Sequence, residues 1–383
     1  MSLPTTMNAV IIEGGNAVVK PAVPLPKLRD GNLLLKTIAV AGNPVDWKSV
    51  ALKFGTQGSI VGCDAVGQIV KLGPNVDPNQ FHIGEYVYGY IHGSCLLAPD
   101  NGAFAEYVAL DSKLAFKTNK NIQFSAVDSI PEGAVSTFEG AASIPCSWGT
   151  AGGSLFYHMG LKLEWKPKTP QRNFPVLVWG GSTALGHALI QLLKTFNAST
   201  DIVVVASKKN EHQLRAIGAT DVFDYHDSDV IKQITDKYSN IQYLFDCVSN
   251  QQTINQVYRC ADSTATATVL NYMGMDINAI EPEIRKNNVK VDGNILYLAL
   301  GSKVVYGDRV FEPNLSYRKV IIDFIKIVNP KLNSGELHHM PIRVYRNGLD
   351  STLQIMKDIR EGKNSGGIKL VATLTDSASS EDN

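Results

Sequence analysis

The chain has 383 residues, of which 44% are hydrophobic and 19% charged, a composition typical of globular proteins and unlike that of disordered ones. Lys plus Arg and Asp plus Glu number 36 each, so the formal net charge is zero. We expect no nucleic-acid partner, because no basic excess exists to neutralise a phosphate backbone. The length predicts about two domains of ordinary size.

The same sequence argues against a membrane or secreted protein. Its apolar stretches are far shorter than the ~20 residues that cross a bilayer, and the N-terminus lacks the basic and apolar regions of a secretory signal. The five cysteines lie far apart without a CxxC pair, which suits a reducing compartment: they are Cys63, Cys95, Cys146, Cys247 and Cys260. We expect a cytoplasmic protein with no membrane partner, and the nucleus as the alternative location.

The first third of the chain is rich in predicted strands. Short apolar runs bounded by Gly, Pro or Asp predict strands at 7–14, 17–24, 31–44, 63–73, 84–91 and 102–110. A helix is expected only near residues 45–54. Glycine inside residues 63–73 indicates a bulge or a tight bend, as in small barrels.

From Phe174 onward strands and helices alternate. Strands are expected at 174–180, 201–207, 221–225, 241–249, 265–272 and 291–300, with amphipathic helices between the first five. Such continuous apolar strands predict a doubly wound parallel sheet with helices on both faces, so the fold class is α/β. A helix over 321–330 is expected to end at Pro330, and a further strand, helix and strand follow at 341–345, 349–362 and 368–374. The polar residues 377–383 are expected to fray.

The strongest chemical signal is the glycine-rich turn after the strand at 174–180. Its glycines permit a tight turn, and the helix that follows offers N–H groups to a pyrophosphate. Thr183 stands where the G-x-G-x-x-G fingerprint has its middle glycine, and the alternative is a turn whose glycines serve packing alone. The expected cofactor-binding residues here are Gly180, Gly181, Ser182, Thr183, Ala184, Leu185 and Gly186.

The next strand ends in Ser207, Lys208 and Lys209. Sites that prefer NAD usually place an acidic residue here to bind the ribose hydroxyls. These donors instead suit a 2′-phosphate, so NADPH is the expected cofactor. NADH and a merely solvated basic loop remain the alternatives.

These motifs together resemble a known family. The segments G-C-D-x-x-G, G-E-Y-V and G-A-F-A-E-Y, then GGSTALG and a closing G-K-N-S-G-G-I-K-L-V, are similar to the medium-chain dehydrogenase/reductase superfamily across nearly the whole chain. Within it the chain resembles the zinc-independent quinone-oxidoreductase-like branch, including fungal trans-acting enoyl reductases and yeast aldehyde reductases. The resemblance implies a GroES-like β-barrel catalytic domain at 1–140 and 335–383, and a Rossmann NADP-binding domain at 141–334.

The chain departs from the zinc enzymes of that superfamily at their ligand positions. Where those enzymes have Cys and then Gly-His-Glu, this chain has Asn43-Pro44 and Gly62-Cys63-Asp64. A catalytic zinc needs three protein ligands and an open position, so no metal is expected. His187 and His226 are expected on the surface.

The resemblance also implies the remaining site residues. Asn43, Lys48 and Thr150 are the expected catalytic residues: Asn43 binds a ribose hydroxyl or the substrate carbonyl, Lys48 stabilises an oxyanion or donates a proton, and Thr150 packs on the nicotinamide. The alternative for Lys48 is an exposed helix lysine. Further cofactor contacts are expected at Tyr225, Cys247, Leu270, Asn271, Asn364, Gly366 and Lys369, the last as a second phosphate partner.

The expected function is an NADPH-dependent oxidoreductase that reduces activated carbonyl compounds, namely quinones, aldehydes, or the C=C bond of enals and enones. A non-catalytic NADPH-binding sensor or partner protein, and a zinc-type alcohol dehydrogenase, are the alternatives. The partner is a small carbonyl substrate, and the chain is a monomer or a homodimer.

Overall fold

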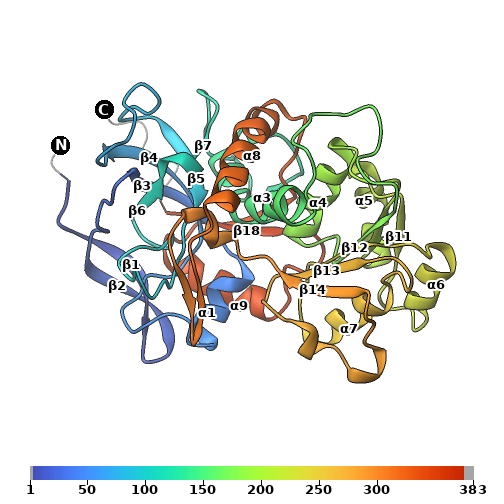
Figure 1. Ribbon diagram of the computed structural model, residues 1–383. Helices are drawn as coiled ribbons and strands as arrows, with labels where there is room; N and C mark the ends of the chain where they lie inside the picture. Colours follow the sequence, from blue (N-terminus) through green and yellow to red (C-terminus); the bar gives the residue numbers. More distant parts are fainter. Residues whose placement is uncertain (1–2, 375–383) are drawn as a thin grey trace. The chain divides into compact units, whose positions relative to one another are not determined.

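The computed structural model describes residues 3–374, so the tail at 377–383 lies outside the described residues (Figure 1). Contacts divide the chain into two compact units. The first comprises Met1–Cys146, Tyr297–Asn364 and Ile368–Asn383, and the second Ser147–Leu296 and Ser365–Gly367. Residues 297–334, expected in the Rossmann domain, thus belong to the first unit.

The first unit is built on a curled eight-stranded sheet of order β7-β5-β4-β3-β18-β17-β8, with β6 also paired to β3. All its strand pairs are antiparallel except β17 with β18. Two hairpins, β1-β2 and β15-β16, accompany it. The strands are β1 Thr6–Glu13, β2 Asn16–Pro24, β3 Asn32–Ala41, β4 Asp64–Leu72, β5 Tyr86–Tyr90, β6 Tyr107–Asp111, β7 Phe116–Lys117, β8 Ser129–Ile130, β15 Val304–Tyr306, β16 Arg309–Phe311, β17 Ile342–Tyr345 and β18 Lys369–Thr373.

Alternating apolar residues of β3 and β4 form the core of this unit. Leu33, Leu35, Ala65 and Ile69 are fully buried there, together with Ile355 of helix α9. The helices that cover the unit are α1 Pro44–Ala51, α2 Phe138–Ala142, α8 Leu315–Ser334 and α9 Asp350–Arg360. Helix α1 follows β3 directly. Residues 43–48 therefore lie at the carboxyl end of this central strand, in the turn after it and the first turns of the helix.

Helix α8 does not end at Pro330, contrary to the sequence expectation, and continues to Ser334. Asn329 and Asn333, on either side of the proline, each donate a side-chain hydrogen bond of 2.9 Å to the Lys117 carbonyl. Gly335, with a φ of 79°, ends the helix. Tertiary contacts on both sides of the proline therefore outweigh the one backbone hydrogen bond that it removes.

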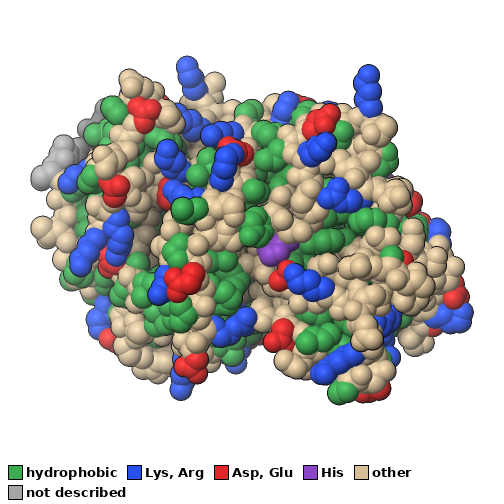
Figure 2. All heavy atoms as spheres, viewed as in Figure 1, with side chains coloured by type: hydrophobic (Ala, Val, Ile, Leu, Met, Phe, Trp, Pro, Cys, Tyr) green, Lys and Arg blue, Asp and Glu red, His purple; other side chains and the backbone are tan. Residues whose placement is uncertain are grey.

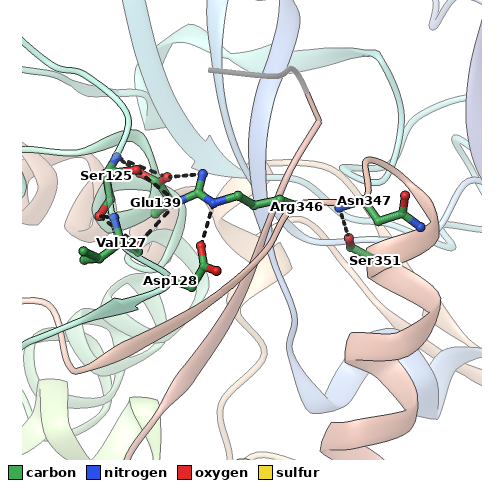
Figure 3. Close-up of polar contacts among 7 residues, drawn as sticks. All are labelled: Ser125, Val127, Asp128, Glu139, Arg346, Asn347 and Ser351. Atoms are coloured by element: carbon green, nitrogen blue, oxygen red, sulfur yellow. Dashed lines mark hydrogen bonds and ion pairs between the residues drawn. The ribbon is translucent and has the colours of Figure 1, made fainter. Parts of the chain in front are cut away.

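An arginine clamp fastens the segment before α2 to the end of β17 (Figure 3). Arg346 bonds Asp128 at 2.6 Å and donates to the carbonyls of Ser125 and Val127 at 3.0 and 3.3 Å. The fully buried Glu139 accepts from the Ser125 N–H at 3.0 Å and lies 3.7 Å from Arg346. The guanidinium thus neutralises a buried carboxylate and ties together segments more than two hundred residues apart.

The second unit contains a six-stranded parallel sheet of order β11-β10-β9-β12-β13-β14. The order runs outward in both directions from β9 and β12, as in the doubly wound dinucleotide-binding fold, which confirms the expected Rossmann sheet. The strands are β9 Val176–Trp179, β10 Ile202–Val205, β11 Asp221–Phe223, β12 Tyr243–Asp246, β13 Ala267–Asn271 and β14 Val289–Gly293.

Helices cover both faces of this sheet. Leu177, Val203 and Leu244 pack with Ile234 of α6 and Val257 of α7 on one face. The side chains of Val204, Ile190 of α4 and Leu214 of α5 gather beside Gly181 on the other. The helices are α3 Pro145–Gly152, which begins in the first unit, a π-helix Gly153–His158, α4 Ala184–Thr195, α5 Glu211–Ile217, α6 Val230–Lys237 and α7 Gln251–Arg259.

Two further expectations for this region were wrong. The strand expected over 291–300 ends at Gly293, opposite the last residue of β13, and a 3-10 helix, Leu296–Leu300, follows. Asn294 turns the chain because its side chain bonds back to residues 150 and 154. His187 is only 3% exposed rather than superficial, because α4 is buried on nearly all sides and Gln191 bonds its ring at 3.0 Å. His226 is exposed, as expected.

Basic and acidic side chains are intermixed over the face drawn in Figure 2, in keeping with the zero net charge. None of the helices described between residues 3 and 374 is long and apolar enough to cross a membrane.

Candidate active site

The glycine-rich turn lies at the carboxyl end of β9, where the strand order reverses. Gly180 has a φ of 86°, a conformation open chiefly to glycine. Thr183 begins α4 as its N-cap: its hydroxyl accepts from the Gly186 N–H at 3.0 Å and donates to the Gly180 carbonyl at 2.8 Å. A Cβ at Gly186 would lie 2.4 Å from that carbonyl. The threonine in place of the middle glycine thus closes the turn, and the N-terminus of α4 retains the positive end of its dipole.

A short segment from late in the chain lies beside this turn in the second unit. A Cβ at Gly367 would lie 3.6 Å from the Ser182 carbonyl, and one at Gly366 would lie 3.8 Å from Lys209 Nζ. Gly367 therefore lies beside the glycine turn and Gly366 beside the basic end of β10, and the cofactor contact expected of Gly366 stays a prediction. Asn364 belongs to the first unit.

Lys208 and Lys209, which follow Ser207 at the end of β10, differ in their surroundings. Lys208 forms an ion pair of 2.8 Å with Glu211 and donates its backbone N–H to Asp224. Lys209 is exposed beside Gly366. Ser207 is partly exposed at the strand end. The best placed cation for a phosphate is thus Lys209, because Lys208 is engaged in an ion pair with Glu211.

The carboxyl ends of β12 and β13 lie on the same side of the sheet as the carboxyl end of β9, next to the glycine turn. Cys247 follows β12, and its Cβ would lie 3.5 Å from a Cβ at Gly180 of the glycine turn. Burial raises the pKa of the Cys247 thiol well above its usual range, so the group stays protonated. Leu270 is fully buried in β13. Tyr225, after β11, is 48% exposed and stacks on His226.

Asn271, expected to contact the cofactor carboxamide, is committed to its own loop. Its side-chain nitrogen donates to the carbonyls of Met275 and Asp292, both at 2.8 Å. Its side-chain oxygen accepts from the backbone N–H groups of Met273 and Met275. The amide therefore shapes the turn after β13.

In the first unit, Asn43, Asp64 and Lys369 form one buried polar cluster. Lys369 Nζ lies 2.6 Å from Asn43 Oδ1 and 3.3 Å from Asp64 Oδ2. Asn43 Nδ2 donates to Asp64 Oδ2 at 2.8 Å, and Asp64 Oδ1 accepts from the Cys146 N–H at 2.7 Å. Lys369 is 4% exposed and Asp64 fully buried. Lys369, expected as a phosphate partner, thus pairs with a carboxylate, and the amide of Asn43 is bonded at both ends.

A second layer of buried groups adjoins this cluster. Asp46 on α1 accepts from the Asn43 N–H at 2.6 Å, and burial raises the pKa of its carboxyl to about 7. Cys63 Sγ lies 2.8 Å from the Tyr297 hydroxyl. The ring of Tyr297 stacks on that of His92, with 4.0 Å between the ring centroids. Burial lowers the pKa of His92 to about 4 and raises that of the Cys63 thiol. Cys63, Tyr297 and His92 are therefore neutral at neutral pH, whereas Asp46 titrates close to it.

These residues do not fit a catalytic zinc. Both oxygens of Asp64 are occupied by Asn43, Lys369 and Cys146, and an ammonium ion lies where a cation would have to bind. Cys63 is protonated and hydrogen-bonded to Tyr297. Throughout residues 3–374, no group of three or more His, Cys, Asp or Glu side chains is arranged to hold a metal ion.

The other two residues expected to be catalytic lie in different units, Lys48 in the first and Thr150 in the second. Lys48 is half-buried on α1, with its Nζ 5.9 Å from the centroid of the Trp47 ring, and Arg360 lies over the same ring at 5.8 Å. Thr150 lies on α3, and its carbonyl accepts hydrogen bonds from Ser154 and Asn294.

The sequence reasoning missed two groups. The ion pair of Lys369 with Asp64 joins residues 305 positions apart, and no local signal announces it. Tyr272 and its partner Ser154 were also missed, although a polar residue directly after β13 stands where ligands bind to parallel sheets.

A doubly wound sheet with a capped glycine turn at its reversal of strand order defines a dinucleotide-binding α/β unit. The chain matches the alcohol dehydrogenase GroES-like domain at residues 29–120 and the zinc-binding dehydrogenase family at residues 184–306. It belongs to the medium-chain dehydrogenase/reductase superfamily, whose members are oxidoreductases that bind NAD(P)H.

Individual relatives extend over almost the whole chain. An uncharacterized protein of Saccharomyces cerevisiae is 51% identical and aligns over 97% of this chain and 99% of its own length. The trans-enoyl reductase buaC of Petromyces alliaceus is 33% identical over 95% of this chain and 96% of its own. The solved CurK enoyl reductase shares the fold at 15% identity and a TM-score of 0.70, over 97% and 99% of the two chains. The solved quinone oxidoreductase of Coxiella burnetii also shares the fold, at 20% sequence identity and a TM-score of 0.66. The match covers 96% of this chain and 99% of that protein.

Proposed function

We propose that this oxidoreductase uses NADPH to reduce an activated carbonyl compound, without a catalytic zinc. The observation that carries the proposal is the turn capped by Thr183 at the reversal of strand order, beside the exposed cation of Lys209. The turn offers backbone N–H groups to a pyrophosphate, and Lys209 suits a 2′-phosphate.

When bound, a reduced nicotinamide would supply a hydride. The chain's own residues have to bind the acceptor and stabilise the negative charge that develops on it. We assign oxyanion stabilisation to Lys48 because it is a half-buried cation that follows the central strand β3 and its short turn. Asn43 holds the start of α1 in place through Asp64 and Lys369, and Thr150 serves the nicotinamide side.

The substrate class rests on the relatives. Proteins named trans-enoyl reductases align with nearly all of this chain, which supports a C=C bond conjugated to a carbonyl as the reduced group. A quinone or an aldehyde is the alternative substrate, in which a C=O group is reduced. The partner is thus a small molecule, bound by a monomer or homodimer in the cytoplasm.

The test is oxidation of NADPH and, separately, NADH by the purified chain with a panel of enals, enones, quinones and aldehydes. Reduction with deuterated cofactor, followed by mass spectrometry and NMR of the product, locates the transferred hydride on carbon β to the carbonyl or on the carbonyl carbon. Turnover with NADPH supports the proposal. Tight NADPH binding without turnover of any acceptor would favour a cofactor-binding sensor instead.

The role of Lys48 is tested with Lys48→Ala. Loss of one oxyanion donor typically lowers kcat on the order of a hundredfold or more, while NADPH binding measured by fluorescence should stay near that of the wild type. Lys48→Arg keeps the charge but cannot release a proton, so it separates electrostatic stabilisation from proton donation. Near-normal turnover of Lys48→Ala would make this lysine a surface residue that merely covers Trp47.

A further inference from the structure

A chain of hydroxyl and amide groups in the second unit includes the hydroxyl of Tyr272. Ser154 Oγ lies 3.0 Å from the Tyr272 hydroxyl and 2.8 Å from the Thr150 carbonyl. Asn294 Nδ2 donates to that carbonyl at 2.9 Å and to Ser154 Oγ at 3.0 Å. Ser154 is fully buried and Asn294 is 4% exposed, while Tyr272 is partly exposed. The network therefore bonds the hydroxyl of a tyrosine that is itself partly exposed.

The backbone around this network is fixed at both sides. Ser154 belongs to the π-helix Gly153–His158, a rare geometry that often marks functional sites. The N–H of Tyr272 donates to Ser249 Oγ at 2.9 Å, and Ser249 follows β12 with a φ of 56°. Tyr272 is thus tied to the end of the neighbouring strand as well as to Ser154.

The hydrogen bonds of Ser154 allow two arrangements. Its single hydrogen points either to the Thr150 carbonyl or to the Tyr272 oxygen. In the second arrangement the Thr150 carbonyl keeps a hydrogen bond from Asn294, so the switch leaves no buried carbonyl without a donor. The Tyr272 oxygen then accepts from Ser154, and its own hydrogen is directed to another acceptor.

Tyr272 follows β13, on the side of the sheet that takes the second half of a dinucleotide. The adenosine half of a dinucleotide lies beyond β9 toward β10, where Ser207 and Lys209 are found, so the other half lies over β12 and β13. We propose that Tyr272 donates the proton that completes reduction of the acceptor, and that Ser154 is a positioning residue that stabilises the resulting phenolate. This inference rests on the proposed reductase function and gives Lys48 the oxyanion role alone.

A bound reduced nicotinamide would supply the acceptor with a hydride, and so with its electron pair, and would itself be oxidised. The acceptor anion takes the proton of Tyr272: the phenol O–H bond breaks and an O–H or C–H bond forms on the product. The phenolate, bonded by Ser154, regains a proton from water when the product leaves.

The first experiment compares Tyr272→Phe with Tyr157→Phe, a control that removes the hydroxyl of a partly exposed tyrosine on the π-helix. With the best acceptor from the panel, Tyr272→Phe should lower kcat on the order of a hundredfold, raise the solvent deuterium isotope effect on kcat above that of the wild type because proton transfer becomes rate-limiting, and leave NADPH affinity unchanged. Tyr157→Phe should match the wild type. Wild-type turnover together with normal kcat in Tyr272→Phe overturns this inference and leaves the proposed function intact, whereas absence of wild-type turnover overturns both.

The second experiment needs no cofactor. In protein labelled with ¹³C-tyrosine, the resonance absent from Tyr272→Phe identifies Tyr272, and its chemical shift is followed as the pH is raised. In Ser154→Ala the shift should change at more alkaline pH than in the wild type, because the phenolate has lost a hydrogen-bond donor. An identical profile in both proteins would show that Ser154 does not act on the phenol.

Discussion

Lys369 Nζ lies 2.6 Å from the side-chain oxygen of Asn43, although the two residues are 326 positions apart. The same ammonium neutralises the buried Asp64 carboxylate. A single lysine of β18 thereby fixes the turn between β3 and α1. Lys48 lies on that helix. The cluster places a neutralised ion pair at a position where the sequence lacks the zinc ligands of the superfamily.

Removal of this lysine should destabilise the folded chain. Lys369→Met leaves Asp64 buried and uncompensated, which costs about 3–5 kcal/mol when one partner of a buried ion pair is lost. Denaturant unfolding should show this loss, while Lys71→Met, at an exposed lysine of β4, should stay near the wild type. The double variant Lys369→Met with Asp64→Asn should recover part of the stability, and equal stability of all variants would contradict the buried ion pair.

Stability should depend on pH through Asp46. Burial raises the pKa of this carboxyl from 3.8 to about 7, so the folded protein holds a proton that the unfolded chain releases. The stabilisation is present below about pH 4 and declines as the pH rises to about 7, by up to about 4 kcal/mol. Asp64, Lys369 and the Cys63 thiol face the same carboxyl.

Asp46→Asn should therefore flatten the pH dependence of the midpoint of denaturant unfolding between pH 5 and 7. Glu361→Gln, at an exposed carboxylate, is the control and should keep the slope of the wild type. A slope that survives in Asp46→Asn would assign the titration to another group.

Cofactor choice should depend on Lys209 far more than on Lys208. Lys209→Ala should raise the KM for NADPH by about tenfold or more, the equivalent of one charge-assisted hydrogen bond, and leave the KM for NADH nearly unchanged. Lys208→Ala should have a small effect, because Glu211 already neutralises that ammonium. Equal losses for both cofactors would show that neither lysine binds the 2′-phosphate.

The glycine turn should not tolerate a methyl group at Gly186. In Gly186→Ala the new Cβ would lie 2.4 Å from the Gly180 carbonyl, so the turn has to open at a cost of about 1–3 kcal/mol. Thermal unfolding and fluorescence titration with NADPH should show lower stability and weaker binding. Gly133→Ala, where a Cβ meets nothing within 4 Å, is the matched control and should change neither.

The sequence by itself determined the parallel sheet, the glycine turn and the superfamily. These features are local: apolar strands of four or five residues, a turn that needs glycine at Gly180, and a helix that begins at Thr183. Each is specified by neighbouring residues, and their order along the chain carries the fold. The absence of the usual zinc ligands was equally visible, at Asn43 and Cys63.

Only the tertiary structure decided what the buried polar residues do. Lys369, predicted as a phosphate partner, forms a buried ion pair with Asp64, and Asn271, predicted as a cofactor contact, holds the Met273–Met275 turn. Both cofactor contacts stay predictions. Pro330 was expected to end a helix that Asn329 and Asn333 extend. In each case the outcome depends on which group lies opposite after folding, because a buried charge or amide must satisfy its hydrogen bonds with whatever partner the fold supplies. Spacing along the chain does not record those partners.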